Sequence, residues 1–123
     1  MTEIQHAIFS ALTALQVAVY DDVPQGASFP YVIIGEDDSV PFDTDDSTGF
    51  DTELTIHIWS RYSGMKEVKD IMSDIYSILN RRELSASGAH VIDCIFQYQD
   101  VLLDPDGITR HGIIRFRLTT ENI

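Results

Sequence analysis

Two stretches of the chain repeat apolar residues at the three- and four-residue spacing of a helix. The first runs from Thr2 to Gln16, and the second opens at Ser63-Gly64 and is followed by Arg81 and Arg82. This spacing puts the apolar side chains on one stripe and therefore predicts two amphipathic helices. The two arginines favour the C-terminal end of the second helix electrostatically. The stripes consist of Ile4, Ala7, Ile8, Ala11, Leu12 and Leu15, and of Met65, Val68, Met72, Ile75, Ile78 and Leu79.

Strand patterns occupy most of the remaining chain. Residues 51–60 alternate apolar and polar side chains and form the clearest predicted strand. Shorter β-prone runs lie at 17–20 and 31–34, the latter expected to be buried on both faces, and longer ones at 91–101 and 108–120. Turn signals stand at Val23–Gly26, Ser85–Gly88 and Asp104–Gly107. This order predicts an α+β fold, a mainly antiparallel β-sheet with two α-helices packed on one face.

An acidic segment interrupts this pattern between Glu36 and Glu53. It contains eight acidic residues and no Lys or Arg, so we expect a long exposed loop or hairpin extension. Carboxylates could bind calcium, but the register of an EF-hand loop is not matched, and solvated charge explains the segment better. The potential ligands are Asp43, Asp45, Asp46, Asp51 and Glu53.

Length and composition indicate one globular domain covering residues 1–123. The longest apolar runs are far shorter than the roughly 20 residues of a membrane-spanning helix, and no signal peptide is recognisable, so we expect no membrane contact and an intracellular protein where it is made. The single cysteine, Cys94, excludes an internal disulfide and is expected to be buried. A net charge of −12 argues against direct binding of nucleic acid.

Residues with catalytic or ligand chemistry form no recognisable constellation. The four histidines, His6, His57, His90 and His111, fall in different elements without metal-ligand spacing. No nucleophile motif and no phosphate-binding glycine loop occurs. We therefore predict no catalytic residue, no metal and no cofactor. An enzyme would require a pocket that gathers His57, His90 or His111 with carboxylates.

The surface of the predicted fold indicates contacts between copies. Helices on one face leave the opposite face and the edge strands to be covered, charged or paired. The last strand concentrates positive charge at Arg110, Arg115 and Arg117, beside His111. This basic patch could meet the acidic segment of a neighbouring copy in head-to-tail fashion. An ordinary solvated strand face is the alternative.

Three stretches of sequence resemble one known family. They are residues 19–35, VYDDVPQGASFPYVIIG, residues 54–61, LTIHIWSR, with Gly64, and residues 106–112, DGITRHG. Together they resemble the tail completion, or tail terminator, family of long-tailed, siphovirus-like phages and prophages. The first stretch is the most specific, and the three span most of the chain.

The resemblance implies an α+β structural protein of the virion. Family members assemble as a ring, commonly a hexamer, that caps the tail tube, stops tail polymerisation and provides the docking surface for the head connector. The implied partners are further copies of the chain, the tail tube protein and a head-completion or connector protein. The implied location is the head–tail junction of the virion, and the host cytoplasm during assembly. DNA would pass the lumen without specific binding, which suits an acidic subunit.

Other functions remain open on the sequence alone. The chain could be a head-completion or connector-ring component, or a small acidic metal-binding or regulatory domain. Trp59, next to Arg61, could be an interface anchor or a core residue at a strand end. The candidate interface residues are Pro24, Gln25, Gly26, Phe29, Asp43, Asp45, Asp46 and Phe50.

Overall fold

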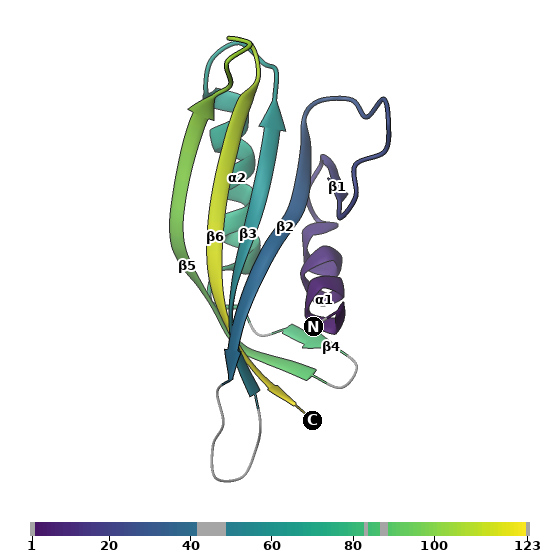
Figure 1. The fold of residues 1–123 in the computed structure, drawn as a ribbon, viewed down its shortest axis with the longest axis vertical. Helices are drawn as coiled ribbons and strands as arrows, with labels where there is room; N and C mark the ends of the chain where they lie inside the picture. Colours follow the sequence, from purple (N-terminus) through teal and green to yellow (C-terminus); the bar gives the residue numbers. More distant parts are fainter. Residues whose placement is uncertain (1, 42–48, 83, 87–88, 123) are drawn as a thin grey trace.

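The computed structural model describes residues 2–41, 49–82, 84–86 and 89–122 (Figure 1). Within these residues, two helices and a six-stranded sheet form one layer packed on another. The elements are α1 (Thr2–Leu12), β1 (Ala18–Tyr20), β2 (Tyr31–Pro41), β3 (Gly49–Ser60), α2 (Lys66–Leu79), β4 (Leu84–Ala86), β5 (Ala89–Leu103) and β6 (Arg110–Asn122).

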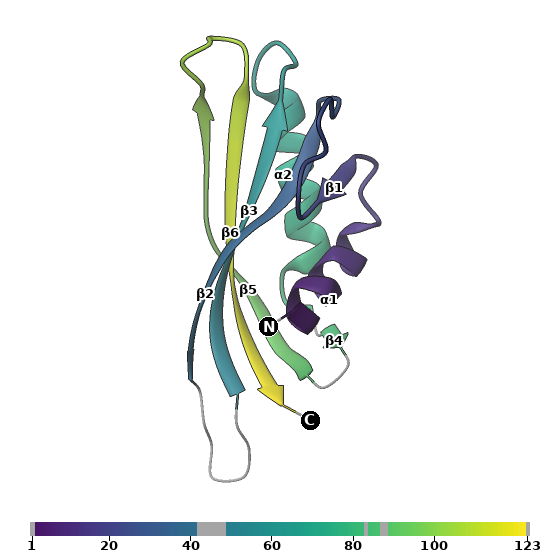
Figure 2. The same ribbon diagram turned by 45° about the vertical axis from the view of Figure 1, so that its right-hand side comes forward.

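The sheet has the strand order β1-β2-β3-β6-β5-β4. Only the short β1 pairs in parallel, with β2, and every other neighbouring pair is antiparallel. Figure 2 shows that the sheet is strongly twisted and that both helices lie on the same face of it. The predicted α+β class, with a mainly antiparallel sheet and two helices on one face, is confirmed.

The core lies between that face and the helices. Alternate residues of the two central strands are buried there, because successive side chains of a strand point to opposite faces. Helix α2 buries four residues of the stripe predicted for it, Val68, Met72, Ile75 and Leu79, with Ile71 in addition, whereas Ile78 is partly buried and Met65 lies just before the helix. The main contributors are Ile56 and Ile58 of β3, Ile114, Phe116 and Leu118 of β6, Val68, Ile75 and Leu79 of α2, and Ile8 and Leu12 of α1. None of the described helices is long and apolar enough to cross a bilayer.

Helix α1 ends at Leu12, four residues before the predicted end at Gln16. The Thr13 hydroxyl donates a hydrogen bond to the Ser10 carbonyl at 2.6 Å, and the Leu15 amide donates to the Leu12 carbonyl at 3.0 Å. These short-range bonds replace the helical pattern. Leu15 still packs against the core, so its place in the apolar pattern indicated a buried side chain and not a further turn of helix.

Strand β2 differs from its prediction in length and in burial. It continues beyond Gly35 to Pro41, and Val32 and Ile34 are buried while Tyr31 and Ile33 are only half-buried. The expectation that this strand is buried on both faces is therefore wrong, because none of the described elements covers the outer face of the sheet.

The described part of the acidic segment forms strand. Asp38 pairs with Glu53 and Val40 with Asp51 across the β2–β3 ladder. Residues 42–48 lie outside the described part of the chain. The turn expected at Ser85–Gly88 is also partly strand, since Leu84–Ala86 forms β4 and pairs with the start of β5.

Candidate functional site

Three loops meet at one end of the sheet, where β3 and β5 finish and β2 and β6 begin (upper end in Figure 1). Arg61, just after β3, holds them together. Its guanidinium lies 4.3 Å from the centroid of the Phe29 ring, and its Nε donates a hydrogen bond to Thr109 Oγ1 at 3.2 Å. The Thr109 hydroxyl in turn donates to Asp106 Oδ2 at 2.7 Å. We name this set, Phe29, Arg61, Asp106 and Thr109, the Arg61 junction.

Asp106 organises the turn between β5 and β6. Its carboxylate accepts hydrogen bonds from the amides of Ile108 and Thr109, each at 2.9 Å, besides the Thr109 hydroxyl. These bonds, led by that of the Thr109 amide, lower the pKa of Asp106 to about 2. Gly107 supplies the positive φ of 72° that the turn requires. The junction therefore carries a fixed negative charge beside Arg61.

The candidate interface residues between Pro24 and Phe29, here called the interface loop, fall into an exposed tip and an internal anchor. The Ala27 amide donates to the Pro24 carbonyl at 3.2 Å and closes a turn, in which Gly26 has a φ of 80°. Pro24, Gln25 and Gly26 are exposed. Phe29 is half-buried between Arg61 and Tyr31, whose ring centroid is 5.0 Å away. The exposed tip is therefore available for contact with a partner.

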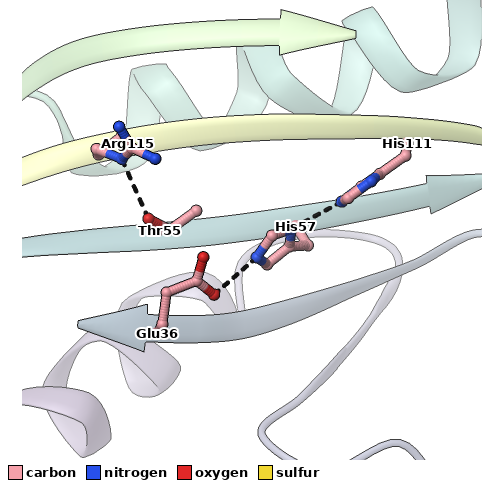
Figure 3. Close-up of polar contacts among 5 residues, drawn as sticks. All are labelled: Glu36, Thr55, His57, His111 and Arg115. Carbon is pink, nitrogen blue, oxygen red and sulfur yellow. Dashed lines mark hydrogen bonds and ion pairs between the residues drawn. The ribbon is translucent and has the colours of Figure 1, made fainter. Parts of the chain in front are cut away.

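A second group of side chains lies on the outer face of the sheet, away from the helices. His57 Nδ1 lies 2.7 Å from His111 Nε2, and His57 Nε2 lies 2.9 Å from Glu36 Oε2 (Figure 3). The His111 ring stacks on Trp59, with centroids 3.9 Å apart and planes 9° from parallel. We name Glu36, His57, Trp59 and His111 the outer-face cluster. It links three strands, β2, β3 and β6.

Strand register and one glycine build this cluster. Trp59 pairs with His111 in the β3–β6 ladder, and a bulge between Ile34 and Asp37 of β2 brings Glu36 towards His57. A Cβ on Gly35 would lie 2.6 Å from His57 Cδ2 and 2.8 Å from a backbone oxygen. Any other residue at this position would displace the imidazole or the strand.

The electrostatics of the cluster show which groups are charged. The hydrogen bond with His57 holds the pKa of the Glu36 carboxyl below its ordinary value of 4.5. Burial, together with repulsion from a charged His57, lowers the pKa of His111 from its ordinary value of 6.5. Glu36 is thus an anion at neutral pH and His111 is neutral.

The outer-face cluster places two imidazoles and a carboxylate in one hydrogen-bonded row. The two imidazole nitrogens face one another instead of converging on a third point. Among the described residues, no group of three or more His, Cys, Asp or Glu side chains is placed to hold a metal ion. The cluster lies on an open face, with 68% of the Glu36 side chain exposed. His90 lies elsewhere, opposite Glu121. The histidines His57, His90 and His111 therefore do not line, together with carboxylates, the pocket that an enzyme would require.

The predicted basic patch is divided between two faces of β6. Arg115 and Arg117 lie on the outer face, where both are engaged within the chain. Arg115 Nε donates to Thr55 Oγ1 at 3.2 Å, and Arg117 forms a two-pronged ion pair with Asp51, in which Nε lies 2.9 Å from Oδ1. This hydrogen bonding lowers the pKa of Asp51 below its ordinary value of 3.8. Arg117 already neutralises one carboxylate of the acidic segment.

Arg110 points to the opposite face, because it lies five positions before Arg115 in a regular strand and an odd offset reverses the face. Its Nη1 donates to the carbonyls of Ile108 at 2.7 Å and Tyr62 at 3.3 Å. Arg110 therefore braces the loops at the end of the sheet. The three arginines do not form one continuous patch.

The remaining candidate residues belong to the acidic segment. Phe50 lies in β3 rather than in a loop, half-buried, and its carbonyl accepts a hydrogen bond from the Thr120 hydroxyl at 3.2 Å. Asp43, Asp45 and Asp46 lie outside the described residues.

Comparison with known proteins identifies the family. A family model described as tail completion protein gp17 matches residues 7–121. The tail completion protein gp17 of Bacillus phage SPP1 is 34% identical over 94 residues, which are 76% of this chain and 69% of that protein. The chain belongs to the tail completion protein gp17 family. This gp17 family member is accordingly a structural component of a phage virion, in agreement with the resemblance seen in its sequence.

Solved structures agree with this assignment. The structure of SPP1 gp17 matches with a TM-score of 0.64 and 29% identity, covering 96% of this chain and 88% of that one. A chain of the virion of a native gene transfer agent particle matches with a TM-score of 0.90, covering 98% and 96%. At 22% identity, the second match shows the fold alone.

The structure explains why the three resembling stretches belong together. The first supplies Phe29 and Gly35, the second His57, Trp59 and Arg61, and the third Asp106, Thr109 and His111. Both the Arg61 junction and the outer-face cluster take residues from all three stretches or their immediate neighbour Glu36. Neither grouping was predicted from the sequence, because the contacts join residues about fifty positions apart.

Proposed function

We propose that this gp17 family member caps the tail tube as a ring, commonly a hexamer, stops tail polymerisation and presents the docking surface for the head connector. The observation that carries this proposal is the family match over residues 7–121, which covers nearly the whole domain rather than a local motif. A protein that completes a tail has to act on its growing end. At that end it would lie between the tail tube and the next component of the particle to bind.

The shape of the subunit supports a position between two different partners. One end of the sheet carries the Arg61 junction and exposes Tyr62 and Ile108, at 55% and 56% of their surfaces. The other end carries the described acidic residues of β2 and β3, among them Asp38 and Glu53. Two chemically different ends suit two different binding partners, and closed rings use head-to-tail contacts between copies. A net charge of −12 suits a lumen through which DNA passes without adhering.

The test uses a phage with a nonsense codon in this gene. Negative-stain images of its particles should show overlong or ragged tails unattached to filled heads, and purified protein should correct both defects. Tails of normal length attached to heads would contradict the proposal.

Within the ring, we place a partner contact at the exposed tip of the interface loop, Pro24, Gln25 and Gly26. A Gln25→Arg protein should fold normally but correct the tail defect poorly. The matched control is Ser73→Arg, on the exposed side of α2, which should correct it as well as the parent. Equal activity of the two variants would exclude the tip from the contact. Arg115 and Arg117 remain the candidates for a contact between copies.

A head-completion or connector-ring role is the second candidate. The observation in its favour is that the two ends of the subunit differ chemically, which would equally suit a ring placed between two other components of the connector. In that case the nonsense phage would make tails of normal length that fail to join heads. Immunogold labelling of intact particles would separate the two positions.

Calorimetry with calcium addresses the metal-binding alternative, which the absence of heat would exclude.

A further inference from the structure

The two histidines of the outer-face cluster share a gap that has room for one proton. Their ring centroids are 4.9 Å apart with planes 28° from parallel, while the facing nitrogens are 2.7 Å apart. The rings therefore meet edge to edge, since overlapping rings would bring other atoms closer than the nitrogens. Such a contact requires one N–H donor and one lone pair.

Glu36 decides which histidine donates. Its carboxylate only accepts hydrogen bonds, so His57 carries a proton on Nε2, where it faces Glu36 at 2.9 Å. A neutral His57 then has a lone pair on Nδ1, and His111 must place its own proton on Nε2, in the gap. This assignment follows from the hydrogen-bond partners.

Acid can add two protons to the His57–His111 pair, and the two protons have different effects. The first can reside on His57, and His111 then moves its own proton to Nδ1, so that the gap still holds one proton. The second makes both rings imidazolium and sets two N–H groups against each other at 2.7 Å. That state is unfavourable, because the two imidazolium charges repel each other and the two N–H groups collide. The pair therefore titrates in two separated steps.

We propose that Glu36, His57 and His111 form a pH-dependent latch across β2, β3 and β6, which stays closed with no added proton or one, and which opens when acid adds the second. Opening breaks the His57–His111 contact and lifts His111 from Trp59. The latch thus controls whether the Trp59 ring on the outer face is covered.

The surroundings support this order of events. The charged groups near the pair are Glu36 from β2, Arg115 from β6 and Asp104 at the end of β5. Opposite the cluster residues, β2 presents Ile33 to His57 and Tyr31 to Trp59, and β5 presents Leu102 to His111. Asp104 and Glu36 favour a charged His111, but burial and a charged His57 oppose it more strongly.

Trp59 is the only tryptophan of the chain, so its fluorescence reports on the latch directly. The full-length protein is titrated from neutral pH into acid, with far-UV circular dichroism to confirm that it remains folded. Because His111 stacks on the indole, opening should change the emission, with a midpoint below 6.5. His111→Gln should abolish the transition. His57→Gln removes the N–H group that would oppose a protonated His111, so His111 can take up a proton without the latch opening, and this variant should abolish the transition as well.

The matched control is His6→Gln, at an exposed position of α1, which should leave the titration unchanged. Proton–nitrogen NMR of the unmodified protein provides a second readout that does not depend on the variants, and at neutral pH it should find both His57 and His111 protonated on Nε2. The latch is refuted by a folded protein with no emission change, by a transition that survives either His111→Gln or His57→Gln, or by His57 protonated on Nδ1 alone.

Discussion

Gly112 offers a direct test of how closely helix α2 lies on the sheet. In the Gly112→Ala protein, the new Cβ would lie 2.7 Å from Val68 Cγ2 and 2.9 Å from Met72 Sδ. Met72 can move, because its thioether ends a flexible chain. Val68 is β-branched and fully buried, so its methyl has no free rotamer to adopt.

The expected loss of unfolding free energy in Gly112→Ala is the difference between two opposing effects. Inserting a methyl into a packed core costs about 1–3 kcal/mol, while the lower chain entropy of unfolded Ala returns about 0.5–1 kcal/mol. Gly112→Ala should therefore lower the free energy of unfolding by about 0–2.5 kcal/mol. Val68→Ala removes the obstructing methyl and alone costs about 2 kcal/mol. The double variant should cost no more than Val68→Ala alone, because the methyl added at position 112 occupies part of the space that Val68→Ala leaves empty.

Urea unfolding followed by far-UV circular dichroism measures all four proteins of this cycle. The matched control pairs Val68→Ala with Gly107→Ala, since nothing lies within 4 Å of a Cβ at Gly107 and only its φ of 72° opposes the change. That pair should be additive. If the Gly112 pair is also additive to within about 0.5 kcal/mol, the inferred clash does not exist.

Three further outcomes are expected. Arg61→Lys should lower the unfolding free energy by about 0.5–1 kcal/mol in urea, because Lys loses the planar cation over Phe29 and the Nε donor. Asp51→Asn should cost less than about 1 kcal/mol at pH 7, because Arg117 is half exposed; this difference should vanish as pH falls through the pKa of Asp51, below 3.8. The buried Cys94 thiol, whose pKa burial raises to about 12, should react with a disulfide reagent only at the rate of unfolding.

The sequence predicted those elements whose own pattern matched their environment. Strand β3 alternates because one face meets the core, and α2 has a stripe because one side lies on the sheet. Helix α1 was predicted four residues too long, because Leu15 keeps helical spacing while packing from a turn. The acidic residues of β2 suggested a loop, since the sequence does not show that a sheet can extend beyond the helices that cover it.

The site was harder to predict than the fold, because its contacts depend on strand register. His57 and His111 are 54 positions apart and become neighbours only when Trp59 pairs with His111. A one-residue shift of that ladder would turn His111 to the core face. Gly35 was visible in the sequence as the end of an apolar run, but its role in admitting the His57 ring requires the bulge beside it.

The place of β6 in the sheet has a consequence during synthesis. A ribosome makes β6 after every other strand, yet β6 lies between β3 and β5 at the centre of the sheet. Until residues 110–122 emerge, the nascent chain holds two separate β layers, β1-β2-β3 and β5-β4, each with an open edge. Chains terminated before Arg110 should therefore be substrates for chaperones and proteases rather than partly active subunits, so a nonsense codon anywhere upstream serves as a complete loss of function.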